Sequence, residues 1–148
     1  MGWSIGYDSN WKRDIGYGVP AVCDHPDCKE KIDRGLSYVC GGEPYGGDAG
    51  CGLYFCNKHL FYSKTDDGPQ RCERCCTPED PDNIKPFDAK PDVQRWINWK
   101  LTAASWAKWR DENPEFIARH ERERHRAIRA RKARAALQSS PDGMGRSE

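Results

Sequence analysis

The chain's capacity for chemistry rests on its eight cysteines and four histidines. All eight cysteines lie between Cys23 and Cys76. Seven of them combine with His59 into one series, which reads Cys23-x4-Cys28, Cys40, Cys51-x4-Cys56-x2-His59, Cys72-x2-Cys75. Zinc prefers thiolate and imidazole ligands, and eight of them suit two tetrahedral ions. We therefore expect a domain that holds two zinc ions as its cofactors.

Short separations along the chain let two of these side chains reach one ion. Cys56 and His59 can share one tight turn, and Cys72 and Cys75 can share another. Each such pair supplies half of a tetrahedral site.

The first pair is spaced more widely, and two further residues are alternative ligands. Cys23 and Cys28 are separated by four residues, but Pro26 between them favours a turn. His25 lies inside this pair and could replace a cysteine, while Cys76 directly follows the last ligand of the series.

Composition explains why such a chain needs metal. The 148 residues are 36% hydrophobic and 32% charged, and the mean hydropathy of −0.96 excludes a large hydrophobic core. A membrane-spanning helix is excluded because the sequence has no long uncharged apolar run. Four disulfides are the alternative staple. Residues 1–8 have neither the basic nor the apolar region of a signal peptide, so we expect a reducing cytoplasm, which favours metal.

The stretch Cys51-Gly52-Leu53-Tyr54-Phe55-Cys56-Asn57-Lys58-His59 resembles the central signature of cross-brace zinc fingers of the FYVE, RING and related treble-clef type. The resemblance covers residues 23–75. It implies a small metal-stabilised α+β fold, a treble-clef or cross-brace two-zinc module with short β-hairpins, followed here by a C-terminal α-helical extension. Its interleaved pairing implies two ligand sets: Cys23, Cys28, Cys56 and His59 for site 1, and Cys40, Cys51, Cys72 and Cys75 for site 2.

The sequence departs from this family in ways that bear on function. Ten residues separate Cys40 and Cys51, where the family has a tight pair. The apolar residues of a RING groove are not evident beside the first and last ligand pairs, where Asp24 and Arg71 occur. The basic cluster with which FYVE domains bind phosphoinositides is replaced by 47–50, Gly-Asp-Ala-Gly.

Eight ligands for two ions predict closed, structural sites, because catalytic zinc keeps one position open for water. We therefore expect a non-enzymatic protein that acts as an adaptor or regulator. The alternative is a zinc-finger enzyme or accessory: a nuclease of treble-clef type, or a RING-like ubiquitin ligase in a eukaryote.

Charge and composition divide the chain. Residues 1–90 hold 11 Lys+Arg and 15 Asp+Glu, and residues 91–148 hold 13 and 8, so an acidic part precedes a basic one. The expected segments are a zinc-binding domain with an N-terminal hairpin region (1–76), a Pro-rich linker (77–91), a Trp-rich helical segment (92–112), a basic helix (113–138) and a disordered tail (139–148).

The Trp-rich segment is expected to be helical, with Asp92 as N-cap. Its large apolar residues cover most of a helix circumference, so either one helix is buried on several sides or, as we favour, the helix breaks near Thr102. Its tryptophans either cover the zinc domain as core or form an interaction surface; they are Trp96, Trp99, Trp106 and Trp109. Their pattern also loosely resembles small proteins of tailed-phage genomes, which implies a phage-encoded protein in a bacterial cytoplasm.

Asn113-Pro114-Glu115 predicts the start of a helix that runs from Pro114 to about Leu137. Arginine side chains dominate it, and their planar forks suit phosphate or carboxylate. The expected partner is nucleic acid, bound with low sequence specificity, or an acidic protein surface; a merely solvated helix is the third possibility. Neither a membrane partner nor a small-molecule substrate is indicated. The candidate binding residues are Arg119, Arg122, Arg126, Arg129, Arg131, Lys132 and Arg134, with Arg124 on the same helix.

Overall fold

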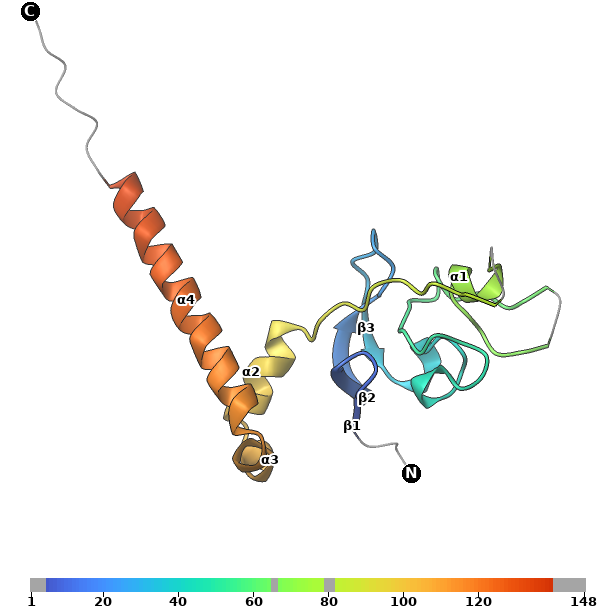
Figure 1. Ribbon diagram of the computed structural model, residues 1–148, viewed down its shortest axis with the longest axis horizontal. Coiled ribbons are helices and arrows are strands. Elements are labelled where there is room, and N and C mark those ends of the chain that lie inside the picture. The colour runs from blue at the N-terminus through green and yellow to red at the C-terminus, as the bar shows by residue number, and fades with distance from the viewer. Residues whose placement is uncertain (1–4, 65–66, 79–81, 140–148) are drawn as a thin grey trace, which may run out of the picture. The chain divides into compact units, whose positions relative to one another are not determined.

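The computed structural model describes residues 5–64, 67–78 and 82–139 (Figure 1). The fold is a small α+β structure that divides into two units, Met1–Asn98 and Trp99–Glu148. Within the described residues, unit 1 contains β1 (Gly6–Asp8), β2 (Arg13–Val22), β3 (Lys31–Arg34), the 3-10 helices η1 (Leu36–Tyr38) and η2 (Pro44–Gly46), and α1 (Glu73–Cys76). The division falls within α2 (Gln94–Thr102), and unit 2 continues with η3 (Ala104–Trp106), α3 (Ala107–Glu112) and α4 (Pro114–Gln138).

The three strands form an antiparallel sheet in the order β1-β2-β3. The first half of β2 pairs with β1, with Gly6 opposite Ile15, and the second half pairs with β3, with Ala21 opposite Ile32. The register between β2 and β3 shifts between Gly16 and Pro20, which lets one long strand serve two partners. The expected N-terminal hairpin is therefore present from Gly6 onward, while Trp3 lies outside the described residues.

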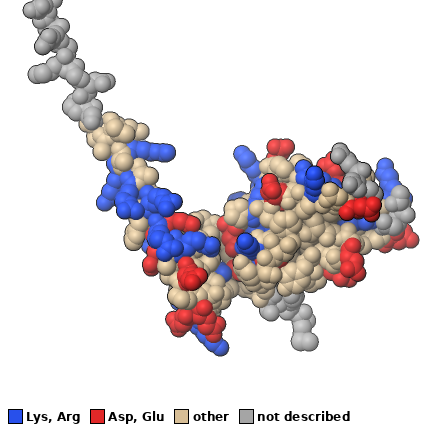
Figure 2. All heavy atoms as spheres, viewed as in Figure 1, with Lys and Arg blue, Asp and Glu red and all other residues tan. Residues whose placement is uncertain are grey.

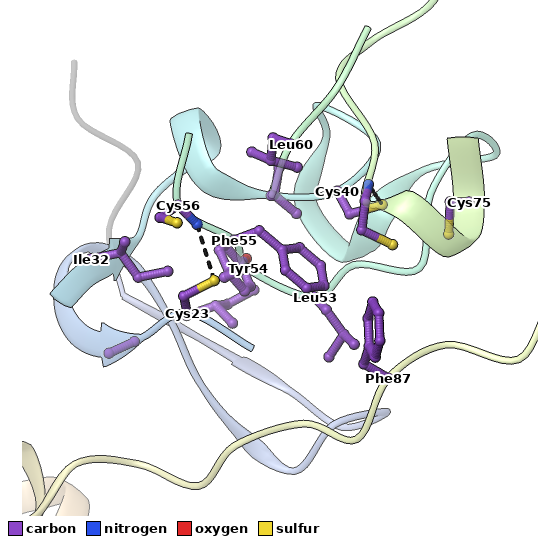
Figure 3. Packing of buried hydrophobic residues seen from close by; sticks show 14 residues of the cluster. Cys23, Ile32, Cys40, Leu53, Tyr54, Phe55, Cys56, Leu60, Cys75 and Phe87 are labelled. Atoms are coloured by element: carbon purple, nitrogen blue, oxygen red, sulfur yellow. Dashed lines mark hydrogen bonds between the residues drawn. The ribbon is translucent and has the colours of Figure 1, made fainter. Parts of the chain in front are cut away.

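The hydrophobic core of unit 1 is small and is built around cysteines, as the composition predicts. It gathers residues from β2, β3 and the segments that follow them (Figure 3): Ile15, Ala21, Cys23, Ile32, Val39, Cys40, Leu53, Tyr54, Phe55, Cys56, Leu60, Cys72, Cys75 and Phe87. Five of the eight candidate ligands belong to this cluster. The candidate metal centres therefore lie within a core that would be too small to stabilise the fold by itself.

The Pro-rich segment 77–91, expected to be a linker, contributes to unit 1. Phe87 is 8% exposed and packs edge-on against Phe55, with ring centroids 5.9 Å apart. Arg74 of α1 lies 4.1 Å from the Phe87 ring and donates hydrogen bonds to the carbonyls of Lys85 and Pro86. Residues 85–87 of this segment are thus fixed by aromatic packing and backbone contacts.

The expected break in the Trp-rich segment is confirmed, because α2 ends at Thr102. The expected cap is wrong: α2 begins at Gln94, and the carboxylate of Asp92 accepts a hydrogen bond from Arg34. Trp96 belongs to unit 1, where it is 5% exposed and its indole N–H donates to Asp14 at 2.7 Å.

Unit 2 has an aromatic core around one ammonium group. Lys100 is 2% exposed, and its Nζ lies 4.9, 3.8 and 4.9 Å from the ring centroids of Trp106, Trp109 and Phe116. The rings pack edge to face, Trp106 on Trp109 at 5.4 Å and Trp109 on Phe116 at 4.9 Å. Trp99 is 43% exposed and reaches this group through Trp106. Cation–π and aromatic contacts thus hold the start of α4 in this unit.

The basic helix is confirmed as α4, with Pro114 in its first turn. Asn113 occupies the cap position, but its amide donates to the carbonyl of Trp109 at 2.8 Å instead of capping α4. From Glu121 to Ser139 every residue is exposed. None of the helices in the described part of the chain combines the length and the hydrophobicity that crossing a membrane requires.

Candidate metal centres

The structure brings the candidate ligands together as two clusters of four. One contains Cys23, Cys28, Cys56 and His59, and the other contains Cys40, Cys51, Cys72 and Cys75. In each cluster the ligand atoms all lie within 4.8 Å of one another. Along the chain the clusters take alternate pairs, which is the grouping that the family resemblance implies.

The β2–β3 connection positions the first two residues of cluster 1. Cys23 directly follows β2, and its N–H donates to the carbonyl of Glu30 at 2.9 Å. The N–H of Cys28 donates to the carbonyl of His25 at 3.1 Å, which makes the turn expected around Pro26. Two sulfurs separated by four residues therefore meet on one side of the turn.

A second turn supplies the other two residues of cluster 1. The N–H of His59 donates to the carbonyl of Cys56 at 2.9 Å, so that both side chains leave the turn on the same side. The N–H of Cys56 also donates to the sulfur of Cys23 at 3.3 Å (Figure 3). Such N–H···S bonds stabilise a thiolate and link the two turns of the cluster.

A folded glycine loop brings the widely separated Cys40 and Cys51 into cluster 2. Gly41 has a φ of +105°, and a Cβ there would collide with the backbone carbonyl of Gly46. A Cβ at Gly50 would likewise collide with the carbonyl of Cys40. The ten-residue insertion therefore closes on itself by close backbone approach, which only glycine allows.

The start of α1 carries the other half of cluster 2. Cys72 precedes the helix and Cys75 lies within it, and the N–H of Cys75 donates to the carbonyl of Cys72 at 3.1 Å. The N–H of Cys72 donates to the sulfur of Cys40 at 3.2 Å. In both clusters, therefore, a residue at the start of a short turn donates its backbone N–H to the sulfur of a cysteine from elsewhere in the same cluster.

The sulfur–sulfur distances fit a tetrahedral metal centre. Metal–sulfur bonds of about 2.3 Å, as in zinc sites, place two tetrahedral ligand sulfurs about 3.8 Å apart. The sulfurs of Cys28 and Cys56 are 3.8 Å apart, and those of Cys51 and Cys72 are 3.9 Å apart. All eight cysteines are free of disulfide bonds, whose sulfurs would be about 2.05 Å apart.

The nitrogen ligand fits the same geometry. His59 turns Nδ1 into cluster 1, where this atom lies 3.5 Å from the sulfur of Cys23 and 3.3 Å from that of Cys56. Metal–nitrogen bonds of about 2.0 Å place nitrogen and sulfur about 3.5 Å apart at the tetrahedral angle. Burial also lowers the pKa of His59, which favours the neutral imidazole that ligates metal.

Hydrogen bonds from the neighbouring thiols of cluster 2, those of Cys51, Cys72 and Cys75, lower the pKa of Cys40 below that of a free thiol. In cluster 1, burial raises the pKa of Cys23 to about 12. A buried thiolate needs a compensating cation, and both clusters lack one among the side chains that form them.

The two alternative ligands lie outside the clusters. Among the described residues, neither His25 nor Cys76 is a member of either group of four. The ring of His25 stacks on that of His59, with centroids 4.0 Å apart and an interplanar angle of 8°. Cys76 is the last residue of α1, and its N–H donates to the carbonyl of Cys72 at 2.8 Å. His25 therefore supports a ligand instead of replacing one.

Sequence reasoning missed Asp24, which lies beside the first ligand. Its carboxylate, 1% exposed, accepts two hydrogen bonds from Arg13, at 2.7 and 2.6 Å, and one from the N–H of Tyr54 at 2.8 Å. A fourth donor is the N–H of Lys90 at 2.8 Å. This one buried carboxylate ties β2, the segment before Cys56 and the Pro-rich segment together.

Lys90 was also missed. Its ammonium donates three hydrogen bonds, to the carbonyl oxygens of Cys23 at 2.6 Å, His25 at 2.7 Å and Cys28 at 2.6 Å. It thereby satisfies the backbone of the turn that carries half of cluster 1. No local signal marks this residue, because its partners lie more than 60 positions earlier.

The candidate binding residues of α4 are placed together on one exposed helix. Arg119 lies 5.3 Å from the ring of Phe116. In the described part of the chain, the other six are not within 4.0 Å of a carboxylate oxygen; they are Arg122, Arg126, Arg129, Arg131, Lys132 and Arg134. Of the candidate tryptophans, Trp96 is core and Trp99 is exposed, while Trp106 and Trp109 are half-buried in unit 2.

Comparison with known proteins gives no relative: no protein-family model, curated protein or solved structure matches the chain.

Proposed function

We propose that this chain is a non-catalytic, zinc-stabilised module that binds nucleic acid through α4. Zinc is favoured over other metals by the donors, three thiolates with one imidazole in cluster 1 and four thiolates in cluster 2. The alternation of pairs along the chain supports a cross-brace arrangement of the treble-clef type.

The metal would act on folding. Each cluster already offers four ligands, which completes a tetrahedral shell and leaves no position for water or substrate. A structural zinc ion supplies about 10–16 kcal/mol of apparent binding free energy to such domains. The residues that hold it, above all Cys23, Cys56, Cys40 and Cys72 of the core, would join the segments of unit 1.

The observation that carries the binding function is the exposed charge of α4. Residues 124–138 contain six Lys and Arg and no Asp or Glu, and each of these residues is exposed. Figure 2 shows this as blue side chains along the helix, with acidic groups toward the end where α4 begins. Such a surface attracts a polyanion through counterion release. Five of the six residues are arginine, whose fork matches phosphate oxygens.

The test measures binding of the metal-loaded full chain to labelled DNA and RNA by fluorescence anisotropy. Contacts to about six phosphates predict that affinity falls about a thousandfold between about 50 and about 200 mM salt. A variant with glutamine in place of the six basic residues of 124–138 should lose binding. The matched control replaces six exposed lysines elsewhere: Lys12, Lys29, Lys31, Lys64, Lys85 and Lys108.

The two variants lose the same charge, so they separate a local site from general attraction. Loss of binding in both to the same degree would contradict a site on α4. Absence of binding by the unmodified chain at low salt would contradict nucleic acid as the partner, and an acidic protein surface would then be the partner to test.

The non-catalytic part of the proposal has its own test. A plasmid-nicking assay with magnesium, manganese or zinc should show no cleavage. Cleavage that disappears on replacing a cluster residue would instead favour the treble-clef nuclease.

A further inference from the structure

The basic residues in the second half of α4 surround the helix. At 100° per residue, Arg124, Arg126, Arg129, Arg131, Lys132 and Arg134 leave no angular gap wider than about 80°. A helix that docks on a flat acidic surface needs cations on one face only. Cations on all sides instead match a partner whose negative charge lies on both sides of the helix.

The groove of a nucleic acid duplex is such a partner. The major groove of B-DNA is about 12 Å wide, close to the diameter of an α-helix with its side chains, and phosphates line both of its walls. The deep, narrow major groove of A-form RNA does not admit side chains in this way. The charge pattern therefore favours double-stranded DNA over RNA.

The rest of the helix surface is compatible with entry into a groove. Three alanines lie between the basic residues and two follow them directly, and all five keep the helix slender: Ala127, Ala130, Ala133, Ala135 and Ala136. Ile128 and Leu137 are 42% and 79% exposed, and every residue of α4 from Glu121 onward is exposed, so packing within the described chain occupies no face of this part of the helix.

The distribution of acidic residues indicates which part of the helix enters. Glu115, Glu121 and Glu123 all lie before Arg124. The imidazole of His120 is 3.3 Å from the carboxylate of Glu123, so this carboxylate contacts a side chain of the same helix in its first half. The first half is thus unsuited to phosphate, whereas residues 124–134 span about 15 Å with basic groups alone.

We propose that the second half of α4 lies in the major groove of double-stranded DNA, with basic side chains on opposite faces of the helix contacting phosphates of the two strands. This deepens the proposed function and rests on it. Because the contacts are to phosphates, the binding has low sequence specificity.

Two charge-matched variants of the full, metal-loaded chain test the two-walled contact. One replaces Arg124, Arg131 and Arg134 with glutamine, and the other replaces Arg126, Arg129 and Lys132 on the opposite face. Arginine and glutamine have similar helix propensities, and far-UV circular dichroism verifies that α4 persists.

In a groove both variants should weaken binding to a duplex of about 20 base pairs by a similar factor, at least about tenfold. Each should also reduce the slope of log K against log salt by about 2 to 3. A large effect of one variant with none of the other would overturn the proposal in favour of a one-sided contact.

A second experiment compares the affinity of the chain for different nucleic acids. The unmodified chain should bind the DNA duplex at least about tenfold more tightly than duplex RNA of the same sequence or either single strand. Glucosylated cytosines that fill the major groove should weaken binding, and the minor-groove ligand distamycin should leave it unchanged. Equal affinity for single strands, or competition by distamycin, would overturn groove entry while leaving nucleic-acid binding intact. Absence of any binding would instead refute the proposed function itself.

Discussion

Lys90 donates a hydrogen bond of 2.6 Å from its ammonium group to the carbonyl oxygen of Cys28, 62 residues earlier in the chain. The same ammonium reaches the carbonyls of Cys23 and His25. One side chain of the Pro-rich segment therefore fixes the backbone that carries two ligands of cluster 1. Segment and cluster should depend on each other for stability.

Replacement of Lys90 by methionine should lower the free energy of unfolding of unit 1 by about 2–4 kcal/mol. It keeps an apolar stem of similar length but removes three hydrogen bonds. The carbonyl of His25 keeps its bond from the N–H of Cys28, whereas those of Cys23 and Cys28 lose their donor, and unsatisfied polar groups cost about 1–3 kcal/mol each. Denaturant unfolding of the metal-loaded chain measures the loss. Lys85→Met is the matched control, because Lys85 is exposed on the same segment. Equal stability of the two variants would show that the three hydrogen bonds contribute little.

Asp24→Asn should destabilise unit 1 by about 3–5 kcal/mol, since it leaves the buried guanidinium of Arg13 without its charged partner. Chemical denaturation gives the measurement. Asp27→Asn, at an exposed position in the same turn, should change the free energy of unfolding by less than about 0.5 kcal/mol. If both substitutions were equally mild, the Arg13–Asp24 pair would not hold the turn.

Two adjacent cysteines provide a sharp test of the ligand set. Cys75→Ser should reduce the bound metal from two ions toward one and destabilise unit 1, because Cys75 belongs to cluster 2. Cys76→Ser should retain both ions, because Cys76 lies in neither cluster. A colorimetric zinc assay on denatured protein counts the ions. The reverse result would exchange the roles of the two residues.

Trp109→Ala should lower the thermal midpoint of unit 2 far more than Trp99→Ala. The Trp109 ring contacts Lys100, Trp106 and Phe116, and loss of a large packed aromatic costs about 3–5 kcal/mol when it is fully buried. Trp99 is 43% exposed, so its loss should cost about 1 kcal/mol or less. Circular dichroism at increasing temperature compares the variants. Similar midpoints would contradict an aromatic core centred on Lys100.

Local signals explain what could be predicted from the sequence. The spacing of Cys56 and His59, and of Cys72 and Cys75, is a property of single turns, and the family resemblance supplied the pairing of those turns. The start of α4 at Asn113-Pro114 and the break at Thr102 are equally local. Each of these features depends on residues within a few positions of one another.

Long-range contacts explain what could not be predicted. Nothing near Lys90 in the chain indicates that it meets Cys23, and nothing near Asp24 indicates that it accepts from Arg13. Asp92 carries the features of a helix cap, but the buried guanidinium of Arg34 competes for its carboxylate. A segment rich in proline is typical of a linker, and only the position of Phe87 in the folded core shows that this part of the segment packs against unit 1.

The central claim, two closed zinc sites formed by eight of the chain's cysteine and histidine side chains, is tested most directly by mass spectrometry. Native spectra of protein purified without chelator should show two bound zinc ions, and the denatured mass should correspond to eight reduced cysteines. A protein without metal whose denatured mass lacks eight hydrogens would contain four disulfides, and that result would contradict the account at its foundation.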